Sequence, residues 1–143
     1  MCKKPKGFTL IEMLIVITII ALLASLILVG MGGARAKARD ARRIADLRSV
    51  QNALELYYSN NSVYPDATTW TGLEDDLKTV NVTKLPKDPD PNATYYYCPV
   101  TGNLSYILAA QLETDDAALN DSLSSGSCGI TCGVDSKGYC LTP

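Results

Sequence analysis

Near the start of the chain, one carboxylate lies inside a long apolar segment. It is the side chain of this region that is best suited to a chemical role. Residues 7–12 read GFTLIE after a lysine-rich start, and Glu12 is the one formal charge in residues 8–30. An ionisable side chain within a segment that could span a membrane costs free energy and marks a functional site by default. We therefore expect Glu12 to belong to an assembly site.

Cysteines form the second group of reactive side chains. The chain has five, and Cys2 precedes Gly7, so a cut after Gly7 would leave an even number. An even number of cysteines is typical of an exported domain held by disulfides. The four that remain are Cys98, Cys128, Cys132 and Cys140.

Four thiolates could instead bind zinc in a tetrahedral site. Only Cys128 and Cys132 form a near pair, and the other two cysteines do not supply a second one. Two disulfides are therefore favoured over a metal. Four cysteines allow three connectivities. Among these we prefer Cys132 with Cys140, which leaves Cys98 for Cys128.

Other ligands and catalytic groups are scarce. The chain has no histidine, so it lacks the commonest general base and metal ligand, and we do not expect an enzyme. Asp115, Asp116, Asn120 and Asp121 could offer oxygen ligands to calcium. They lack the regular alternation and the glycine turn of an EF-hand loop. We expect a solvated loop and no cofactor.

The elements that position Glu12 begin with residues 8–30, which as a helix would reach roughly 35 Å. That length suits a bilayer core of about 30 Å, and it exceeds the apolar region of a secretory signal. An ordinary membrane signal anchor is the alternative interpretation of this segment. Residues 31–60 are expected to continue as an amphipathic stem, since apolar residues recur at steps of three and four. That stripe contains Ile44, Leu47, Val50, Leu54, Tyr57 and Tyr58, while Arg43 and Arg48 fall largely elsewhere.

The remainder, residues 61–143, is expected to be a small head. A short helix is expected near residues 72–79, a hairpin from residues 93–98 and 104–112, and a short strand at residues 139–141. A loop region held by the last three cysteines would complete it. The predicted fold class is therefore α+β, a long helix packed on a small antiparallel sheet, with residues 1–7 as a leader.

Charge is distributed unevenly along the chain. Residues 35–48 carry six basic and two acidic side chains, whereas the residues beyond 49 carry four lysines and twelve acids. The basic stem could bind nucleic acid through phosphates, but no aromatic residues interleave with its arginines as a single-strand platform requires. We favour contacts with lipid headgroups or with acidic neighbours in an assembly.

The order of lysine-rich leader, Gly7, Phe8, Glu12 and apolar helix resembles the amino-terminal signal of type IV pilins and pseudopilins. The resemblance extends to Tyr64 and Pro65, and the PKDP stretch at residues 86–89 before a tyrosine-rich hairpin is similar to the major pseudopilins. The trailing cysteine loop departs from that pattern. The resemblance implies a pilin-like fold.

The resemblance also implies a role for each residue of the motif. A prepilin peptidase would cut between Gly7 and Phe8, where a residue without a side chain lets a protease approach the backbone. The new Phe8 amine would be methylated, and Glu12 would pair with the Phe8 ammonium of a neighbouring subunit. The product would be a structural subunit that leaves the cytoplasmic membrane, through an inner-membrane assembly platform, for a helical filament of identical subunits.

Three functions fit this sequence. The first is the subunit of an extracellular type IV pilus. The second is a pseudopilin of a type II secretion or DNA-uptake system, which would build an envelope-spanning filament. The third, from another class, is a single-pass membrane protein whose head binds a ligand and which forms no filament. Filament formation separates the third from the other two.

Overall fold

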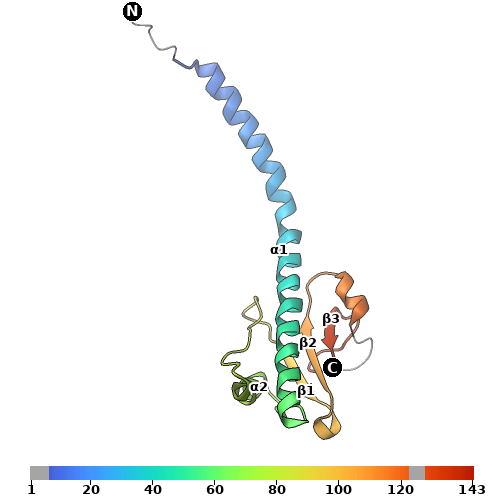
Figure 1. Ribbon diagram of the computed structural model, residues 1–143. Coiled ribbons are helices and arrows are strands. Elements are labelled where there is room, and N and C mark those ends of the chain that lie inside the picture. The colour runs from blue at the N-terminus through green and yellow to red at the C-terminus, as the bar shows by residue number, and fades with distance from the viewer. Residues whose placement is uncertain (1–6, 123–127) are drawn as a thin grey trace, which may run out of the picture. The chain divides into compact units, whose positions relative to one another are not determined.

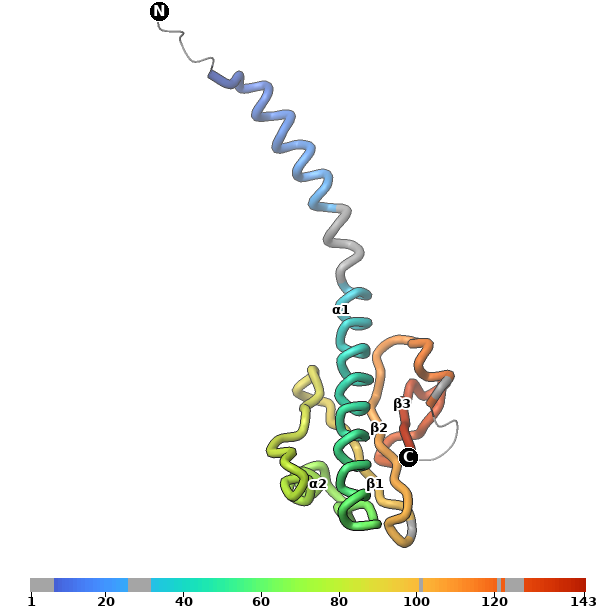
Figure 2. Tube along the Cα trace, viewed as in Figure 1, coloured from blue at the N-terminus to red at the C-terminus, as the bar shows by residue number. Residues whose placement is uncertain are grey.

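The computed structural model describes residues 7–122 and 128–143, with side chains omitted at residues 26–31, 101 and 121. Contacts divide the chain into two compact units, Met1–Arg35 and Ala36–Pro143. Figures 1 and 2 show the order of the elements along the chain. In sequence these are α1 (Leu10–Asn61), α2 (Trp70–Leu77), η1 (Lys78–Val80), β1 (Tyr96–Pro99), η2 (Thr101–Asn103), β2 (Tyr106–Gln111), η3 (Ala117–Asp121) and β3 (Gly138–Leu141).

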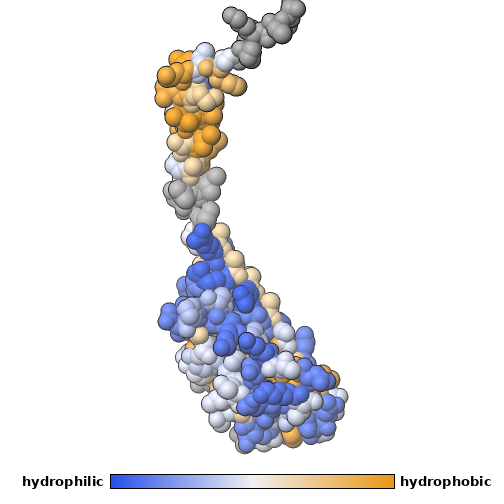
Figure 3. Space-filling view, turned by 90° about the vertical axis from the view of Figure 1, so that its left-hand side faces the viewer, coloured by the Kyte–Doolittle hydropathy of each residue, from blue (hydrophilic) through white to orange (hydrophobic). Residues whose placement is uncertain are grey.

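The first unit contains the amino-terminal part of α1, whose apolar side chains are exposed to solvent in the single chain. Leu10 is 85% exposed and Leu22 is 62% exposed. Figure 3 shows hydrophobic side chains covering this part of the helix. In residues 7–122 and 128–143 we find no helix with the length and apolar character needed to cross a membrane. The span predicted for residues 8–30 includes residues 26–30, whose side chains are not described.

The second unit is built on the remaining part of α1, whose apolar stripe packs into the core. Leu47, Val50 and Leu54 are at most 1% exposed, and Ile44 packs against them. Burial of a side chain of this kind stabilises a fold by about 1.5 to 3 kcal/mol. The predicted amphipathic stem is confirmed in this unit, and α1 ends at Asn61, close to the predicted end.

A three-stranded antiparallel sheet, in the order β1-β2-β3, packs on this stripe. The predicted hairpin and the short carboxyl-terminal strand are confirmed. Because side chains alternate along a strand, the sheet has two different faces. One face, with Tyr97, Tyr106 and Leu108, joins the main core, whereas Ala109 and Cys140 on the other face join a second cluster.

The carboxyl-terminal loop packs closely against that second face, and two glycines allow the contact. Gly129 has a φ of 72°, and a Cβ placed there would lie 2.0 Å from the ring of Tyr96. A Cβ at Gly138 would lie 1.9 Å from the carbonyl oxygen of Thr131. Only glycine can occupy such positions without displacing its neighbour. The head therefore consists of a helix, a sheet and a covering loop.

The short helix α2 begins at a polar cap and buries one apolar side. Thr69 is the N-cap, and its hydroxyl accepts a hydrogen bond from the Gly72 N–H at 3.1 Å. Leu73 and Leu77 are fully buried against the core. The predicted short helix is confirmed, with its start two residues earlier than expected because Thr69 supplies the cap.

Candidate processing and assembly site

The motif at residues 7–12 lies at the start of α1, and its polar atoms satisfy one another. The Thr9 backbone N–H and hydroxyl both donate to Glu12 Oε2, at 2.8 and 2.7 Å. In return, the Glu12 N–H donates to Thr9 Oγ1 at 3.3 Å. This reciprocal arrangement is a capping box, in which the first and fourth residues satisfy the free N–H groups of a helix start.

Thr9 is a site residue that the sequence analysis missed. The signal was present, because threonine followed three residues later by glutamate and then by an apolar run is the pattern of a capping box. Both donors from Thr9 bind Oε2 of Glu12, and among the described residues no hydrogen bond reaches Oε1. The same carboxylate can therefore cap its own helix through one oxygen and accept from a further donor through the other.

The residues on either side of the expected cut are accessible. Nothing lies within 4 Å of a Cβ built on Gly7. The Phe8 side chain is 81% exposed. The exposure of Gly7 and Phe8 among the described residues is compatible with access by a peptidase, and the cleavage itself stays a prediction.

In the second unit, the basic stem contains a buried ion network. Arg43 is 1% exposed and Asp40 is fully buried, so the expectation that Arg43 lies away from the buried stripe is wrong. Arg43 Nε and Nη2 donate to the two carboxylate oxygens of Asp88, both at 2.9 Å. Its Nη1 donates to Asp40 Oδ1 at 2.7 Å and to Glu113 Oε1 at 2.8 Å. Arg39 also binds the Glu113 carboxylate.

The buried carboxylate of Asp40 in this network also accepts hydrogen bonds from neutral donors. Asp40 accepts hydrogen bonds from the Glu113 N–H and from the N–H and hydroxyl of Thr114, at 2.8 to 3.2 Å. Burial raises the pKa of Asp40, but these hydrogen bonds outweigh it, so its pKa lies below the ordinary value. Hydrogen bonds from Arg39 and Arg43 lower the pKa of Glu113 to about 2. The charges are thus held in their ionised states.

This network fastens two loops to α1. Asp88 belongs to the proline-rich loop at residues 86–91, and Glu113 follows β2. A guanidinium that forms two parallel bonds with a carboxylate fixes both partners in one geometry. Arg43 therefore helps to position the head on the helix, and it is not free to bind phosphates. Lys37, Arg42 and Arg48 remain exposed on the stem.

The four later cysteines form two disulfides. Cys98 pairs with Cys128, and Cys132 pairs with Cys140. This is the connectivity that we preferred from the sequence. The first bridge joins β1 to the covering loop and the second joins that loop to β3, so both fasten the loop to the same face of the sheet.

The acidic residues considered for calcium take other partners. Asp115 forms an ion pair with Lys137 at 3.6 Å, and Asp116 Oδ1 caps η3 by accepting from the Ala118 N–H at 2.9 Å. The side chain of Asp121 lies outside the described residues. Within the described part of the chain, no three carboxylates or cysteines are grouped to hold a metal. The expectation of no cofactor stays a prediction.

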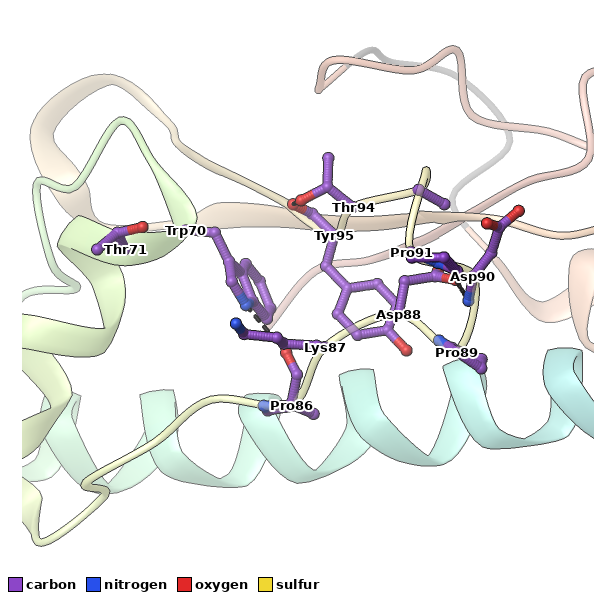
Figure 4. Close-up of a pocket in the computed structure, with 11 residues that line it drawn as sticks. Trp70, Thr71, Pro86, Lys87, Asp88, Pro89, Asp90, Pro91, Thr94 and Tyr95 are labelled. Atoms are coloured by element: carbon purple, nitrogen blue, oxygen red, sulfur yellow. Dashed lines mark hydrogen bonds between the residues drawn. The ribbon is translucent and has the colours of Figure 1, made fainter.

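A pocket of about 540 Å³ lies between α2 and the proline-rich loop of the second unit (Figure 4). The rings of Trp70 and Tyr95 meet edge to face in it, with centroids 5.4 Å apart. The Trp70 Nε1 donates to the Pro86 carbonyl at 3.1 Å, and the Tyr95 hydroxyl donates to Asp46 at 2.8 Å. No feature of the sequence singled out this pocket.

An exposed apolar helix that begins at the capped, accessible motif of residues 7–12, together with a helix-on-sheet head, is typical of the pilin-like class of subunits. The family model described as "Prokaryotic N-terminal methylation motif" matches residues 2–28. The chain belongs to the type IV pilin and type II secretion pseudopilin family.

That assignment rests on several similar proteins, each named type II secretion system core protein G. The protein of Vibrio cholerae is 36% identical over 68% of this chain and 73% of its own length. The protein of Pseudomonas aeruginosa is 31% identical over 69% of this chain and 78% of its own length. The Escherichia coli protein is 42% identical, but the match covers about half of each chain. No solved structure gives a significant match.

Proposed function

We propose that this chain is a pseudopilin, the subunit of a filament in a type II secretion system. The carrying observation is the motif at residues 7–12, capped at the start of an exposed apolar helix, in a chain similar to type II secretion core proteins G. Those relatives favour the pseudopilin over the extracellular pilus that the sequence analysis placed first. A structural subunit of this kind is not an enzyme.

Before assembly, in this proposal, residues 8–30 anchor the chain in the inner membrane with the head in the periplasm. The disulfides suit that side of the membrane, because they persist in an oxidising compartment. The prepilin peptidase hydrolyses the bond between Gly7 and Phe8, and the released amine of Phe8 is methylated. The assembly platform of the inner membrane then adds the subunit to the filament.

During assembly, Glu12 accepts the Phe8 ammonium of a neighbouring subunit. A carboxylate at the centre of a membrane costs about 2.5 to 3.5 kcal/mol on insertion scales, and a cation nearby offsets this cost where the dielectric constant is low. Glu12 Oε1 is available for the contact while Oε2 keeps the helix capped. The exposed apolar side chains of the first unit pack against those of other subunits.

Mass spectrometry of the protein purified from its own cells tests the processing step. The expected mature chain begins at Phe8, carries one added methyl group and contains two disulfides. An intact chain beginning at Met1 would contradict the proposal and would favour the membrane signal anchor.

A second experiment separates secretion from other uses of a filament. Deletion of the gene should abolish export of the proteins that leave the cell through the same secretion system, and the unaltered gene should restore it. Normal export in the deletion strain, with filaments absent, would contradict a role in secretion.

A further inference from the structure

The pocket between α2 and the proline-rich loop combines aromatic and proline surfaces with polar and charged side chains. Its rings are held in place, since the Trp70 indole and the Tyr95 hydroxyl each donate to a fixed acceptor of the same chain. Pro86, Pro89 and Pro91 add rigid apolar surface. A volume of about 540 Å³ falls in the range of sites that hold a compact ligand. Arg43 binds the carboxylate of Asp88, and no histidine or cysteine among the described residues lines the pocket, so the pocket suits binding and not catalysis.

A second apolar feature lies elsewhere on the same unit. Four exposed apolar side chains come from the end of α1 with the residues after it and from the turn between β1 and β2, two segments that a backbone hydrogen bond joins, and we call this group the end patch. Leu104 is the most exposed of the four, at 65%. The end patch consists of Tyr58, Val63, Val100 and Leu104.

Contacts of the described residues hold the end patch together. The Tyr64 N–H donates to the Asn103 carbonyl at 2.8 Å, which joins the segment after α1 to the turn. The Tyr58 ring stacks on the Tyr64 ring with centroids 4.6 Å apart. A group of exposed apolar residues on hydrogen-bonded segments is a candidate contact surface, whereas one exposed leucine alone would not be.

We propose that Leu104 and its end patch insert into the Trp70 pocket of a second copy of this chain. This inference rests on the proposed function, because a filament brings the heads of identical subunits together. A patch and a pocket at different places on one molecule form a heterologous contact, which repeats without closing and produces a filament. A surface that bound the same surface of a second copy would produce a closed dimer instead.

Charge supports the same pairing. Lys87 lies at the pocket, is exposed and forms no ion pair with the described residues. Glu55 lies beside the end patch, since its carboxylate accepts from the hydroxyls of Tyr64 and Tyr106 at 3.1 to 3.2 Å. A patch inserted into the pocket brings this acidic group toward a basic one. Opposite charges at the rim of an interface fix its register and speed association.

Cysteine cross-linking in assembled filaments tests the contact. Leu104→Cys and Thr71→Cys are placed on the end patch and on the pocket, both in the full chain expressed in its own cells. Filaments sheared from the surface of cells overproducing the subunit are treated with a short bis-maleimide and separated by denaturing electrophoresis. The double variant should give a ladder of covalent oligomers.

The single variants provide the decisive controls. In a heterologous contact neither new cysteine meets a copy of itself, so each single variant alone should stay monomeric. Filaments assembled from a mixture of the two single variants should give dimers and no ladder. A pair with Asn52→Cys, an exposed position on α1, in place of Leu104→Cys should lose the ladder.

The outcomes separate this inference from the proposed function. Filaments that form normally from the double variant but give no cross-link would overturn the contact and leave the pseudopilin assignment standing. Dimers from either single variant would also overturn it, because they indicate an isologous contact. If the parent chain is neither processed nor assembled, the proposed function itself fails.

A substitution gives a second readout that does not need cross-linking. Leu104→Asp places a charge where the pocket of the next subunit expects an apolar group, and we expect a loss of sheared filament with normal processing at Gly7. Val134→Asp, at another exposed apolar position, should leave the filament yield unchanged. Equal yields from the two variants would overturn the proposed contact.

Discussion

The two units of this chain share one helix, but the side chains of that helix find their partners in different ways in the two units. In the first unit, side-chain hydrogen bonds join near neighbours, such as Thr9 with Glu12 and Thr18 with the Leu14 carbonyl. In the second unit they join distant segments, such as Arg43 with Glu113, 70 residues away. The apolar side chains differ in the same way, exposed in one unit and buried in the other.

This difference separates assembly from folding. A helix whose contacts are all local gains little stability from its own chain, because helical stability in proteins comes mostly from tertiary packing. Its exposed apolar surface needs other molecules, whereas the head carries its own core, ion network and disulfides. Changes in the first unit should therefore alter assembly, and changes in the second unit should alter stability.

The largest expected effect is the loss of filaments on substitution of Glu12. Glu12→Gln keeps an oxygen that can accept from Thr9 but removes the charge, so it tests pairing with a cation apart from helix capping. We expect no filament in the sheared fraction from Glu12→Gln or Glu12→Ala, with an unchanged unfolding temperature of the head. Electron microscopy and electrophoresis of that fraction provide the measurement.

Thr18→Ala is the matched control, because it removes a polar group from the same part of α1 without touching the motif. It should assemble normally. Normal filaments from Glu12→Gln would show that the capping box, and not the charge, is what assembly requires. A lower unfolding temperature in Glu12→Ala would contradict the separation of the two units.

The next effect is the destabilisation of the head by loss of Arg43. Arg43→Met leaves Asp40 and Asp88 buried without their cation, and removal of one partner from a buried ion pair costs about 3 to 5 kcal/mol. Arg42→Met is the control, since Arg42 is 64% exposed and lies 3.8 Å from Asp46. It should cost less than about 1 kcal/mol. Denaturant unfolding of the full chain in detergent measures both, and equal losses would contradict a structural role for the network.

Arg43 also shows what the sequence could and could not predict. The stripe of Leu47, Val50 and Leu54 follows a helical period, so its burial could be predicted from local spacing. Arg43 looked like part of a solvated basic stem, because arginine is rarely fully buried unless it is paired. Its partner Asp88 is 45 residues away, and no local pattern joins them.

The assembly motif and the covering loop also differ in how far they could be predicted from local sequence. Residues 7–12 are contiguous, so a lone acid in an apolar run indicated an assembly site, and the resemblance to pilin signals implied processing and docking there. The capping role of Thr9 was overlooked. The bridges that hold the covering loop match the pairing preferred from the sequence, but its close fit on the second face of the sheet could not be predicted, because that fit depends on contacts of Gly129 and Gly138 with residues that are not adjacent in sequence. The pocket depends likewise on α2 and a loop that are separated in sequence.

A third effect is the loss of stability on removal of either disulfide. In the chain-entropy description, a bridge between residues 30 apart contributes about 3.6 kcal/mol and one between residues 8 apart about 2.5 kcal/mol. Replacement of Cys98 and Cys128 by alanine should therefore destabilise the head more than replacement of Cys132 and Cys140. Denaturant unfolding of the two double variants gives the comparison. The reverse order would show that contacts of the covering loop, and not closure of the chain, dominate.

The smallest expected effect is a dependence of head stability on acid. The pKa of Glu113 is lowered to about 2 by hydrogen bonds from Arg39 and Arg43. Its value in the unfolded chain is about 4.3. A carboxylate with a lowered folded pKa contributes stability that is present above the unfolded pKa and is lost as the pH falls through the folded one. The unfolding temperature of the full chain should thus be nearly constant above about pH 5 and should fall between about pH 5 and pH 2.

Two variants test whether the ion network of the second unit causes this fall of the unfolding temperature with decreasing pH. Glu113→Gln removes the titrating group, so its unfolding temperature should fall less steeply over the same range than that of the parent chain. Arg39→Ala removes one of the two cations that lower the pKa of Glu113, so the decline should be shallower than in the parent chain and should end at a higher pH. Glu12→Gln should follow the parent curve, since Glu12 belongs to the first unit. Identical slopes for the parent chain and Glu113→Gln would show that the network does not link acid to the stability of the head.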